Sequence, residues 1–521
     1  MAMIDARGVR RNALIQSEIC VIGAGAAGIA LARELIGHGA RVCLLESGGL
    51  ELDEETQSLA KGENVGLPYY PLEGIRRRHF GGTTAIWTGM CRPLDETDFE
   101  SRPWVPHSGW PFDRAHLEPF YQRAQKVCQL GPYRYDASYW IRPDRPVLQF
   151  AGDRVQNAVF QFGPPTHFGE VYRNDISSAT NIQTYLHANV VKLETSEMGE
   201  LVTYARVGCL NGNEFSVAAK FFVLATGAIE NARLLLLSND VNKAGLGNQN
   251  DLVGRFFAEH PRLKSGLILT ANPNAQLGLY RLTPLAGFGV KTLLVIGAET
   301  QRREQLPGFS AVLGPHEKES PGVASAKRLY LDVRRGNMPK SFLWHLKNVI
   351  WDIDDVARVA YNELLRKPAH VLELENLIEP VPNPSSRVML GTERDALGKP
   401  RIRLDWRLTD GDLHTIVRAQ EIIAHELGRT GLGRLKIELD PRKGWPESME
   451  GAYHHMGMTR MQDSPKLGVV DRNCRVHGIR NLFVAGSSVF PTTGYANPTL
   501  TIVALAIRLA EHLKRLVGGA R

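Results

Sequence analysis

The stretch from Ile19 to Glu46 reads ICVIGAGAAGIALARELIGHGARVCLLE and decides the fold of this chain. Its first four residues are apolar and predict a short buried strand. The glycine-rich turn GAGAAG follows, and then an apolar helical pattern over Ile29–Ile36. Val42–Leu45 predicts a second buried strand. A strand, a helix and a strand at this spacing indicate a Rossmann-type βαβ unit, which binds dinucleotides.

The glycines of the turn have separate roles in such a unit. Gly23 allows the tight turn, Gly25 lets a pyrophosphate approach the backbone, and Gly28 lets the helix pack on the strand. The helix N-terminus then presents a partial positive charge to the phosphates. Glu46 lies 18 residues after Gly28, where a carboxylate accepts hydrogen bonds from ribose hydroxyls and disfavours a 2′-phosphate. This pattern argues against NADP and leaves FAD and NAD open.

A second glycine cluster, Gly81-Gly82-Thr83-Thr84, precedes Ala85-Ile86-Trp87-Thr88. Paired glycines beside small hydroxyl residues can present backbone N–H groups to a phosphate or to the edge of a flavin ring. An ordinary surface loop has the same composition. The residues alone leave both interpretations open.

Composition excludes several classes of protein. The 521 residues carry a formal net charge of +7, and 43% of them are hydrophobic, as in ordinary globular proteins. Glycine is in excess, with 50 residues or about 10% against a usual value of about 7%. The only tight basic run is Arg76–Arg78, which is too short for a nucleic-acid-binding surface. No apolar run of about 18 residues predicts a membrane span, and no signal core is evident, so we expect a cytoplasmic protein.

The cysteines predict neither a disulfide scaffold nor a metal centre. They are few and show no C-x-x-C spacing. The six are Cys20, Cys43, Cys91, Cys128, Cys209 and Cys474.

The rest of the chain predicts a second domain inserted into the first. Phe221–Leu224 predicts a buried strand that runs into Ala225-Thr226-Gly227, and Gln183–Leu193 predicts another strand. Further strands are expected at 267–269, 292–296 and 309–313, a hairpin at 387–406, and a long helix at 410–428. We therefore expect a discontinuous cofactor domain over residues 1–110, 180–262 and 440–521. The substrate domain would cover residues 111–179 and 263–439.

The C-terminal part contains two candidate catalytic positions. Asn497 precedes Pro498 and an amphipathic helical pattern, and helix capping alone would explain it. His454 and His455 are adjacent, so on an extended segment they point to opposite faces and make a poor metal pair. One of them could serve as a general base and the other be structural, although the residues alone favour a structural histidine.

Together these segments resemble the glucose-methanol-choline (GMC) family of FAD-dependent alcohol oxidoreductases, and most closely its bacterial branch near pyranose oxidase and the glycoside-3-oxidising enzymes. The resemblance covers the chain from about residue 17 to its end and is weakest in the middle. It rests on Val21–Gly28, Phe80–Thr84, Leu224–Ala228, His454–Gly457 and Ala485–Thr501. It implies an α/β fold with a Rossmann-type FAD-binding domain and an inserted α+β substrate domain built on a mainly antiparallel sheet.

The resemblance also implies roles for both candidate positions. His454 matches the catalytic histidine, which accepts the hydroxyl proton of the substrate, while Asn497 hydrogen-bonds the same oxygen and the carbinol hydride passes to flavin N5. The helix after Asn497 would direct its positive end at the flavin pyrimidine ring. Residues expected to bind FAD are Gly23, Gly25, Gly28, Glu46, Gly81, Gly82, Thr83, Trp87, Thr88, Val190, Ala225, Gly227, Gly486 and Thr499.

One departure from the family pattern concerns attachment of the cofactor. Ile86 occupies the position at which the pyranose-oxidase variant has a histidine bonded covalently to FAD. An isoleucine cannot form this bond, so we expect non-covalent FAD. The same resemblance implies that Thr88 would lie near flavin N5 and that Val190 would contact the adenine.

The implied function is oxidation of an alcohol on a sugar, glycoside or related polyol. The alternatives are oxidation of a natural-product hydroxyl, as on an aminosugar or cyclitol, and a hydroxynitrile-lyase-type reaction without net redox change. The partner is a small-molecule substrate, with oxygen, a quinone or a cytochrome as electron acceptor, and neither nucleic acid nor a metal is expected. The substrate class rests on the resemblance alone.

Overall fold

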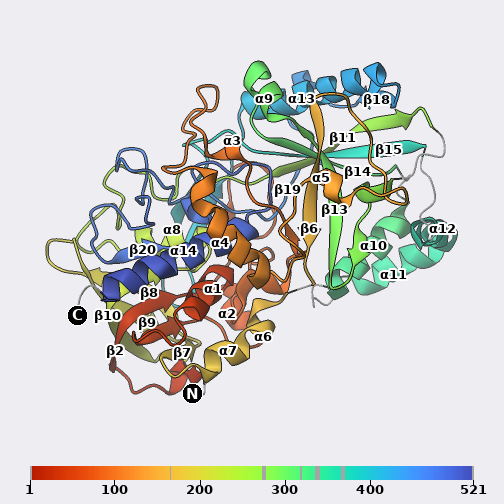
Figure 1. Ribbon diagram of the computed structural model, residues 1–521. Coiled ribbons are helices and arrows are strands. Elements are labelled where there is room, and N and C mark those ends of the chain that lie inside the picture. The colour runs from red at the N-terminus through yellow and green to blue at the C-terminus, as the bar shows by residue number, and fades with distance from the viewer. Residues whose placement is uncertain are drawn as a thin grey trace.

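The computed structural model describes residues 3–164, 166–272, 277–316, 320–334, 341–364 and 370–518. Two large sheets organise this part of the chain, one at the lower left and one at the upper right of Figure 1. The first has the order β1-β7-β3-β2-β10-β9-β8, and β20 pairs with β10 on the side. Its strands are β1 (Ile4–Asp5), β2 (Leu14–Ile22), β3 (Val42–Leu45), β7 (Ile182–Leu186), β8 (Asn189–Thr195), β9 (Val202–Gly208), β10 (Glu214–Leu224) and β20 (Leu482–Val484).

The centre of the first sheet is parallel, as the βαβ prediction requires. β2 pairs in parallel with both β3 and β10, and β3 pairs in parallel with β7. The last four residues of β2 and all of β3 are buried, which agrees with their continuous apolar sequence. Helix α1 (Ala26–Glu34) connects the two strands, so the predicted unit is confirmed.

One strand prediction at the edge of this sheet is wrong in its extent. Residues 183–193 form two strands, because His187 adopts a left-handed backbone conformation with φ of 58° between β7 and β8. β7 continues the parallel part of the sheet, whereas β8 pairs antiparallel with β9.

The second sheet is antiparallel and has the order β18-β11-β15-β14-β13-β6-β5, with β12 paired to β13 and β19 paired to β11. It confirms the strands expected at 267–269, 292–296 and 309–313 and the expected fold class. Its strands are β5 (Met90–Cys91), β6 (Val155–Phe162), β11 (Pro261–Thr270), β12 (Thr283–Leu285), β13 (Phe288–Ile296), β14 (Phe309–Pro315), β15 (Val371–Ile378), β18 (Gly433–Ile437) and β19 (Glu450–Gly451). The residue boundaries proposed for the two domains stay a prediction.

The predicted hairpin forms a small third sheet. β16 (Arg387–Arg394) and β17 (Pro400–Asp405) pair antiparallel, and β4 (Gly62–Asn64) joins β17 in parallel. Residues 387–405 therefore pair with a segment that follows the βαβ unit.

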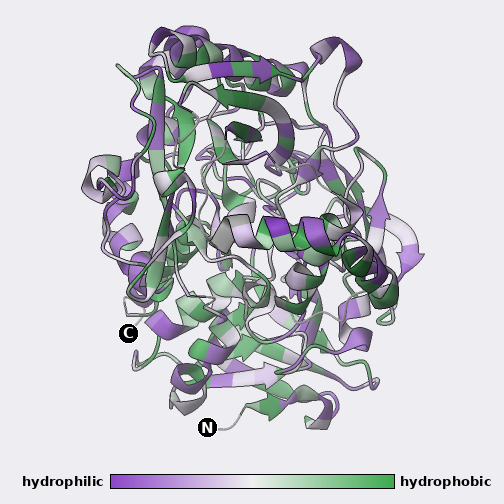
Figure 2. Cartoon of the chain, turned by 90° about the vertical axis from the view of Figure 1, so that its right-hand side faces the viewer, coloured by the Kyte–Doolittle hydropathy of each residue, from purple (hydrophilic) through white to green (hydrophobic). Residues whose placement is uncertain are grey.

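Amphipathic helices cover the sheets, and Figure 2 shows helices that carry hydrophobic and hydrophilic residues side by side. The predicted long helix is α13 (Asp410–Arg429), which packs on β15, β14 and β18 of the second sheet. Helix α14 (Thr499–Gly518) packs against helices α1 and α4 (Arg114–Val127), as Figure 1 shows. The exposed face of α11 (Phe342–Trp351) carries Leu343, Trp344, Ile350 and Trp351.

The remaining helices are shorter or lie between these elements. The α-helices are α2 (Glu54–Ser58), α3 (Glu96–Phe99), α5 (Ala137–Trp140), α6 (Phe168–Val171), α7 (Arg173–Ser178), α8 (Ala228–Leu237), α9 (Ala298–Glu304), α10 (Pro321–Arg334), α11 (Phe342–Trp351) and α12 (Ile353–Leu364). The 3₁₀ helices are η1 (Ala6–Gly8), η2 (Gly82–Ala85), η3 (Gly278–Tyr280), η4 (Pro441–Lys443) and η5 (Ser487–Val489). Within the described ranges, no helix combines the length and apolar character needed to cross a membrane.

Candidate active site

A cavity of about 580 Å³ is lined by residues of both large sheets. Its size lies within the range of roughly 300–1,000 Å³ that is typical of small-molecule sites. Of the sixteen residues predicted for the site, fourteen line this cavity. They are Gly23, Gly25, Glu46, Gly82, Thr83, Trp87, Thr88, Val190, Ala225, Gly227, His454, Gly486, Asn497 and Thr499.

The two remaining residues, Gly28 and Gly81, do not line the cavity but pack closely against neighbouring backbone. A Cβ atom on Gly28 would come within 1.9 Å of the Gly23 carbonyl oxygen. Gly81 has a φ of 101°, and a Cβ there would lie 2.6 Å from the backbone nitrogen of Gly169. Both glycines therefore permit close packing of the segments that form the wall.

Gly25 differs from both of them because it faces open space. A Cβ atom placed on Gly25 would meet no protein atom within 4 Å, and the residue lines the cavity. It is also the N-cap of α1, whose first turn begins at Ala26. The backbone N–H groups of this helix end carry partial positive charge, which favours an anionic group in the adjoining space.

Glu46 is buried at the end of β3 and lines the same part of the cavity. Its carboxylate accepts hydrogen bonds from the backbone N–H of Ala24 at 2.8 Å and of Gly48 at 2.9 Å. The hydroxyl of Ser47 donates a third bond at 2.9 Å. These donors hold the carboxylate beside the glycine-rich turn.

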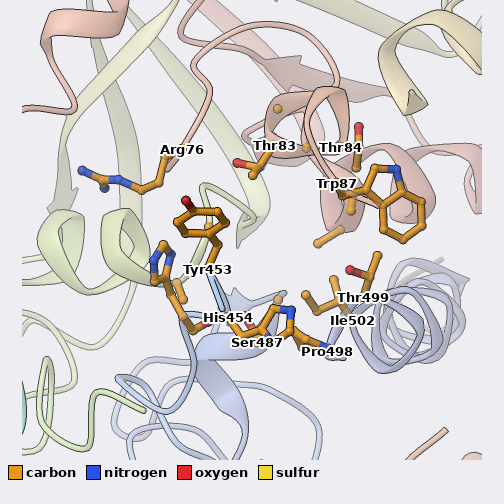
Figure 3. Close-up of a pocket in the computed structure, with 18 of the residues that line it drawn as sticks. Arg76, Thr83, Thr84, Trp87, Tyr453, His454, Ser487, Pro498, Thr499 and Ile502 are labelled. Atoms are coloured by element: carbon orange, nitrogen blue, oxygen red, sulfur yellow. Dashed lines mark hydrogen bonds between the residues drawn. The ribbon is translucent and has the colours of Figure 1, made fainter. Parts of the chain in front are cut away.

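The segment that contains the second glycine cluster forms one wall of the cavity, opposite the C-terminal segments. Figure 3 shows Thr83, Thr84 and Trp87 on the side of the cavity opposite Tyr453 and Pro498. The indole N–H of Trp87 donates to the Thr166 carbonyl at 3.1 Å, which fixes the ring. The cluster is therefore part of the cavity wall, which removes the surface-loop alternative.

His454 and Asn497 meet inside the cavity. The amide nitrogen Nδ2 of Asn497 lies 3.2 Å from Nε2 of His454. Helix α14 begins two residues after Asn497, at Thr499, and its first bond runs from the Ile502 N–H to the Pro498 carbonyl. Asn497 thus directs its amide toward His454 from the N-terminal end of this helix.

His260 is a site residue that the sequence analysis missed. Its Nδ1 lies 3.0 Å from Nδ1 of His454, and its Nε2 lies 2.9 Å from the Gly494 carbonyl oxygen. His260 is completely buried and immediately precedes β11. No spacing motif links it to His454, so only the folded chain reveals the pair.

Glu259 is a second missed residue, and it holds the backbone around His454. Its buried carboxylate accepts hydrogen bonds from the N–H of Ala452 at 3.1 Å and of His454 at 2.9 Å. The hydroxyl of Tyr69 also donates to it, and Nε2 of His455 lies 3.0 Å from the Tyr69 oxygen. Burial raises the pKa of Glu259 to about 7, although the hydrogen bonds that it accepts favour the ionised form.

The three histidines of the site are neutral near neutral pH. Burial lowers the pKa of His454 well below its ordinary value, and repulsion between protonated His454 and its neighbours His260, His455 and Arg262 lowers it further. Burial also lowers the pKa of His260 to about 4 and the pKa of His455 to about 3. A neutral imidazole carries one N–H and one unprotonated nitrogen, so His454 can accept a proton.

The second sheet supplies a mixed polar and apolar wall. Arg262 of β11 pairs with Glu375 of β15, with Nε 2.7 Å from Oε1. Lys291 of β13 and Ser310 of β14 also line this wall. Its apolar members are Phe160, Phe162, Leu293, Val312 and Leu377.

Metal ligands do not gather in the described part of the chain. No group of three or more His, Cys, Asp or Glu side chains there is arranged to hold a metal ion. The six cysteines are buried and form no disulfide.

Comparisons with known proteins agree with this geometry. Residues 382–506 match the family model described as GMC oxidoreductase, and residues 18–242 match the model described as FAD dependent oxidoreductase. The chain is 38% identical to C-glycoside 3-oxidase from Microbacterium trichothecenolyticum, over 87% of this chain and 78% of that protein. It is 25% identical to 6'''-hydroxyparomomycin C oxidase from Streptomyces lividus, over 95% of this chain and 92% of that protein.

Among solved structures, the crystal structure of pyridoxine 4-oxidase from Mesorbium loti is similar over 95% of this chain and 98% of that chain. The TM-score is 0.57 and the sequence identity is 18%. At this identity the likeness concerns the fold alone.

Proposed function

Because this chain belongs to the GMC oxidoreductase family, whose members are FAD-dependent enzymes acting on CH–OH donors, we propose that it oxidises a hydroxyl of a sugar, glycoside or related polyol to a carbonyl. The observation that carries this proposal is the pair formed by His454 and Asn497. Their side chains lie 3.2 Å apart in a cavity lined by both large sheets.

The residues around the cavity fit FAD. Gly25 leaves its edge open where a Cβ atom would otherwise project, and the N-terminus of α1 favours the pyrophosphate at that edge. Glu46 would accept hydrogen bonds from the ribose hydroxyls, and Val190 would contact the adenine. Trp87, Thr88 and the N-terminal end of α14 would lie near the flavin ring. The remaining wall residues of this half are Gly23, Gly82, Thr83, Ala225, Gly227, Gly486 and Thr499.

The protein residues would perform the proton chemistry. Bound FAD supplies the acceptor for the hydride of the carbinol carbon. Nε2 of His454 accepts the hydroxyl proton, and the neutral state that burial imposes leaves this residue able to do so. The amide N–H of Asn497 donates to the same oxygen as negative charge develops on it. Both groups lie side by side in the cavity, so substrate binding requires only that the Asn497 amide shift its hydrogen bond from Nε2 of His454 to the substrate oxygen.

The wall formed by the second sheet supports a polyhydroxylated substrate. Arg262, Lys291, Ser310 and Glu375 offer donors and acceptors for hydroxyl groups, and the apolar residues between them can contact the C–H faces of a sugar ring. The relative C-glycoside 3-oxidase is named for such a substrate. The glycoside class therefore has both a chemical and a comparative basis.

A hydroxyl of an aminosugar is the second candidate substrate. It is favoured by the similarity to 6'''-hydroxyparomomycin C oxidase over nearly the whole chain. Glu375 lines the cavity and provides a carboxylate near which an ammonium group would be stabilised.

We also propose that FAD is held without a covalent bond. Ile86 lines the cavity directly before Trp87 and has no nucleophilic atom. The cofactor would then be retained by backbone contacts, by its hydrogen bonds to Glu46 and by the shape of the cavity.

The test is anaerobic reduction of the purified holoenzyme by sugars, C-glycosides, O-glycosides and aminosugars, each followed by the visible absorption of FAD. We expect rapid loss of the oxidised absorption with at least one sugar or glycoside, and a rate about 100-fold lower in the His454→Ala variant. His425→Ala changes an exposed histidine of α13 outside the cavity and serves as the matched control. Reduction by aminosugars alone would favour the second candidate. An unchanged rate in His454→Ala would exclude His454 as the base.

A further inference from the structure

We infer that His260 is a positioning residue that fixes the tautomer of His454 and leaves its Nε2 atom unprotonated toward the cavity. This inference rests on the proposed function, because it concerns the residue proposed as the base. It follows from a chain of hydrogen bonds in which each donor and acceptor determines the next.

This series of hydrogen bonds starts at Gly494, whose carbonyl oxygen can only accept a hydrogen bond. Nε2 of His260 lies 2.9 Å from this oxygen, so Nε2 carries the proton of the His260 ring. His260 is completely buried and burial lowers its pKa to about 4, so the ring has a single N–H. Nδ1 of His260 is therefore an acceptor.

The next link is the contact between the two rings. Nδ1 of His260 and Nδ1 of His454 are 3.0 Å apart, and their planes are nearly perpendicular at 88°. Because the atom on His260 accepts, the atom on His454 must donate, and Nδ1 of His454 carries a proton. The neutral His454 ring then has its lone pair on Nε2.

The last link agrees with this assignment. The amide Nδ2 of Asn497 lies 3.2 Å from Nε2 of His454 and can only donate. The two partners of His454 thus require the same tautomer from opposite ends of the ring. When a substrate hydroxyl reaches Nε2, it replaces the Asn497 amide N–H at this lone pair, which then takes the hydroxyl proton.

A buried ion pair holds Gly494, the first member of this series of hydrogen bonds, in place. Arg102 and Glu379 are buried, with Nη1 of Arg102 2.8 Å from Oε2 of Glu379. Glu379 accepts a hydrogen bond from the backbone N–H of Gly308 at 2.8 Å, and the backbone N–H of Gly494 interacts with the same carboxylate and helps to lower its pKa. Gly494 therefore presents its N–H to Glu379 and its carbonyl to His260, which fixes the position of the His260 ring.

The arrangement also serves the protonated base. Once Nε2 of His454 has taken the substrate proton, the Nδ1–H of the resulting imidazolium still donates to His260. His260 can accept this bond because its own proton stays on Nε2. A base oriented by a third group in this way is a general feature of activated catalytic pairs.

Two substitutions separate the functions of the two His260 nitrogens. The amide of glutamine reaches the position of Nε2, so His260→Gln keeps a donor for Gly494 and loses the acceptor for His454. The amide oxygen of asparagine reaches the position of Nδ1, so His260→Asn keeps that acceptor and loses the bond to Gly494. We expect kcat to fall about 100-fold in His260→Gln, with KM changed less than about threefold, and less than about tenfold in His260→Asn.

FAD content and melting temperature of both variants control for a structural effect. A kcat in His260→Gln within about threefold of the wild type would overturn the inference, and so would equal losses in the two variants. If His454→Ala keeps its activity, His454 is not the base and the proposed function is wrong at that point. The kcat values of the His260 variants then do not test the role of His260, and the measurement of the tautomer alone does.

The tautomer is measured independently of activity. In holoenzyme labelled with ¹⁵N-histidine, long-range ¹H–¹⁵N spectra distinguish a ring protonated at Nδ1 from one protonated at Nε2, and comparison with His454→Ala assigns the signals. We expect His454 of the wild-type enzyme to be protonated at Nδ1. Protonation at Nε2 would overturn the inference whatever the variants do, including the case in which they fail to fold.

Discussion

The Nδ1 atoms of His260 and His454 lie 3.0 Å apart, although 194 positions separate the two residues in the chain. His260 precedes the first residue of β11, and His454 follows β19, which pairs with that end of β11. The pairing of Pro261 with Gly451 brings both histidines to the same edge of the second sheet. Backbone register thus creates the contact that orients the proposed base.

Replacing Asn497 tests whether this residue acts on the substrate oxygen or caps α14. We expect Asn497→Ala to lower kcat by about 10²–10³, because the donor to the developing oxyanion is lost. Serine caps helices well, so Asn497→Ser would restore activity if capping were the only role. We expect Asn497→Ser to be as slow as Asn497→Ala, as measured by anaerobic FAD reduction with the best substrate.

Substitutions of Gly25 and Gly28, in the glycine-rich segment GAGAAG, are expected to change different properties. In Gly25→Ala the new methyl group meets no protein atom and projects toward the proposed pyrophosphate site, so we expect an unchanged melting temperature of the apoprotein and at least about tenfold weaker FAD binding. In Gly28→Ala the Cβ atom would lie 1.9 Å from the Gly23 carbonyl oxygen, so we expect the apoprotein itself to be destabilised. Calorimetry and FAD titration measure the two effects. Full FAD affinity in Gly25→Ala would contradict the placement of the pyrophosphate.

The attachment of FAD is tested by acid precipitation. Because Ile86 offers no atom for a covalent bond, we expect a colourless protein pellet and a yellow supernatant after precipitation of the holoenzyme. Retention of yellow colour in the pellet after washing in denaturant would mean that another residue forms the bond.

Burial of His455 makes stability depend on pH. Its pKa falls from 6.5 to about 3 in the folded protein, so the unfolded chain binds a proton that the folded chain does not. Its contribution is fully present above the unfolded pKa and is lost as the pH falls below it. Lowering the pH from about 7.5 to about 5.5 should therefore cost about 1 kcal/mol of unfolding free energy through this residue.

The matched variant is His455→Gln, which does not titrate and can keep a polar group near the Tyr69 hydroxyl. We expect its unfolding free energy to fall by about 1 kcal/mol less than that of the wild type over the same pH interval, as measured by urea denaturation in excess FAD. An equal fall in both proteins would show that His455 is not held neutral.

Much of the fold could be predicted because its signals are local. The apolar runs of β2 and β3, the GAGAAG turn between them and the amphipathic pattern of α13 each depend on neighbouring residues, and all three were confirmed. The strand predicted over 183–193 failed because one residue, His187, reverses its backbone twist without any glycine or proline to mark it. The expectation of a cytoplasmic location stays a prediction.

Sequence by itself determined the nucleotide-binding unit, because glycine spacing, helix periodicity and the terminal Glu46 follow from chain geometry over fewer than thirty residues. It also indicated His454 and Asn497 as candidates, through a family pattern. Only the tertiary structure decided that Glu259 and His260 hold the backbone and the ring of His454, because these contacts join segments nearly 200 residues apart. The tautomer of a histidine depends on which donor or acceptor lies beside each nitrogen, and strand pairing alone brings those partners together.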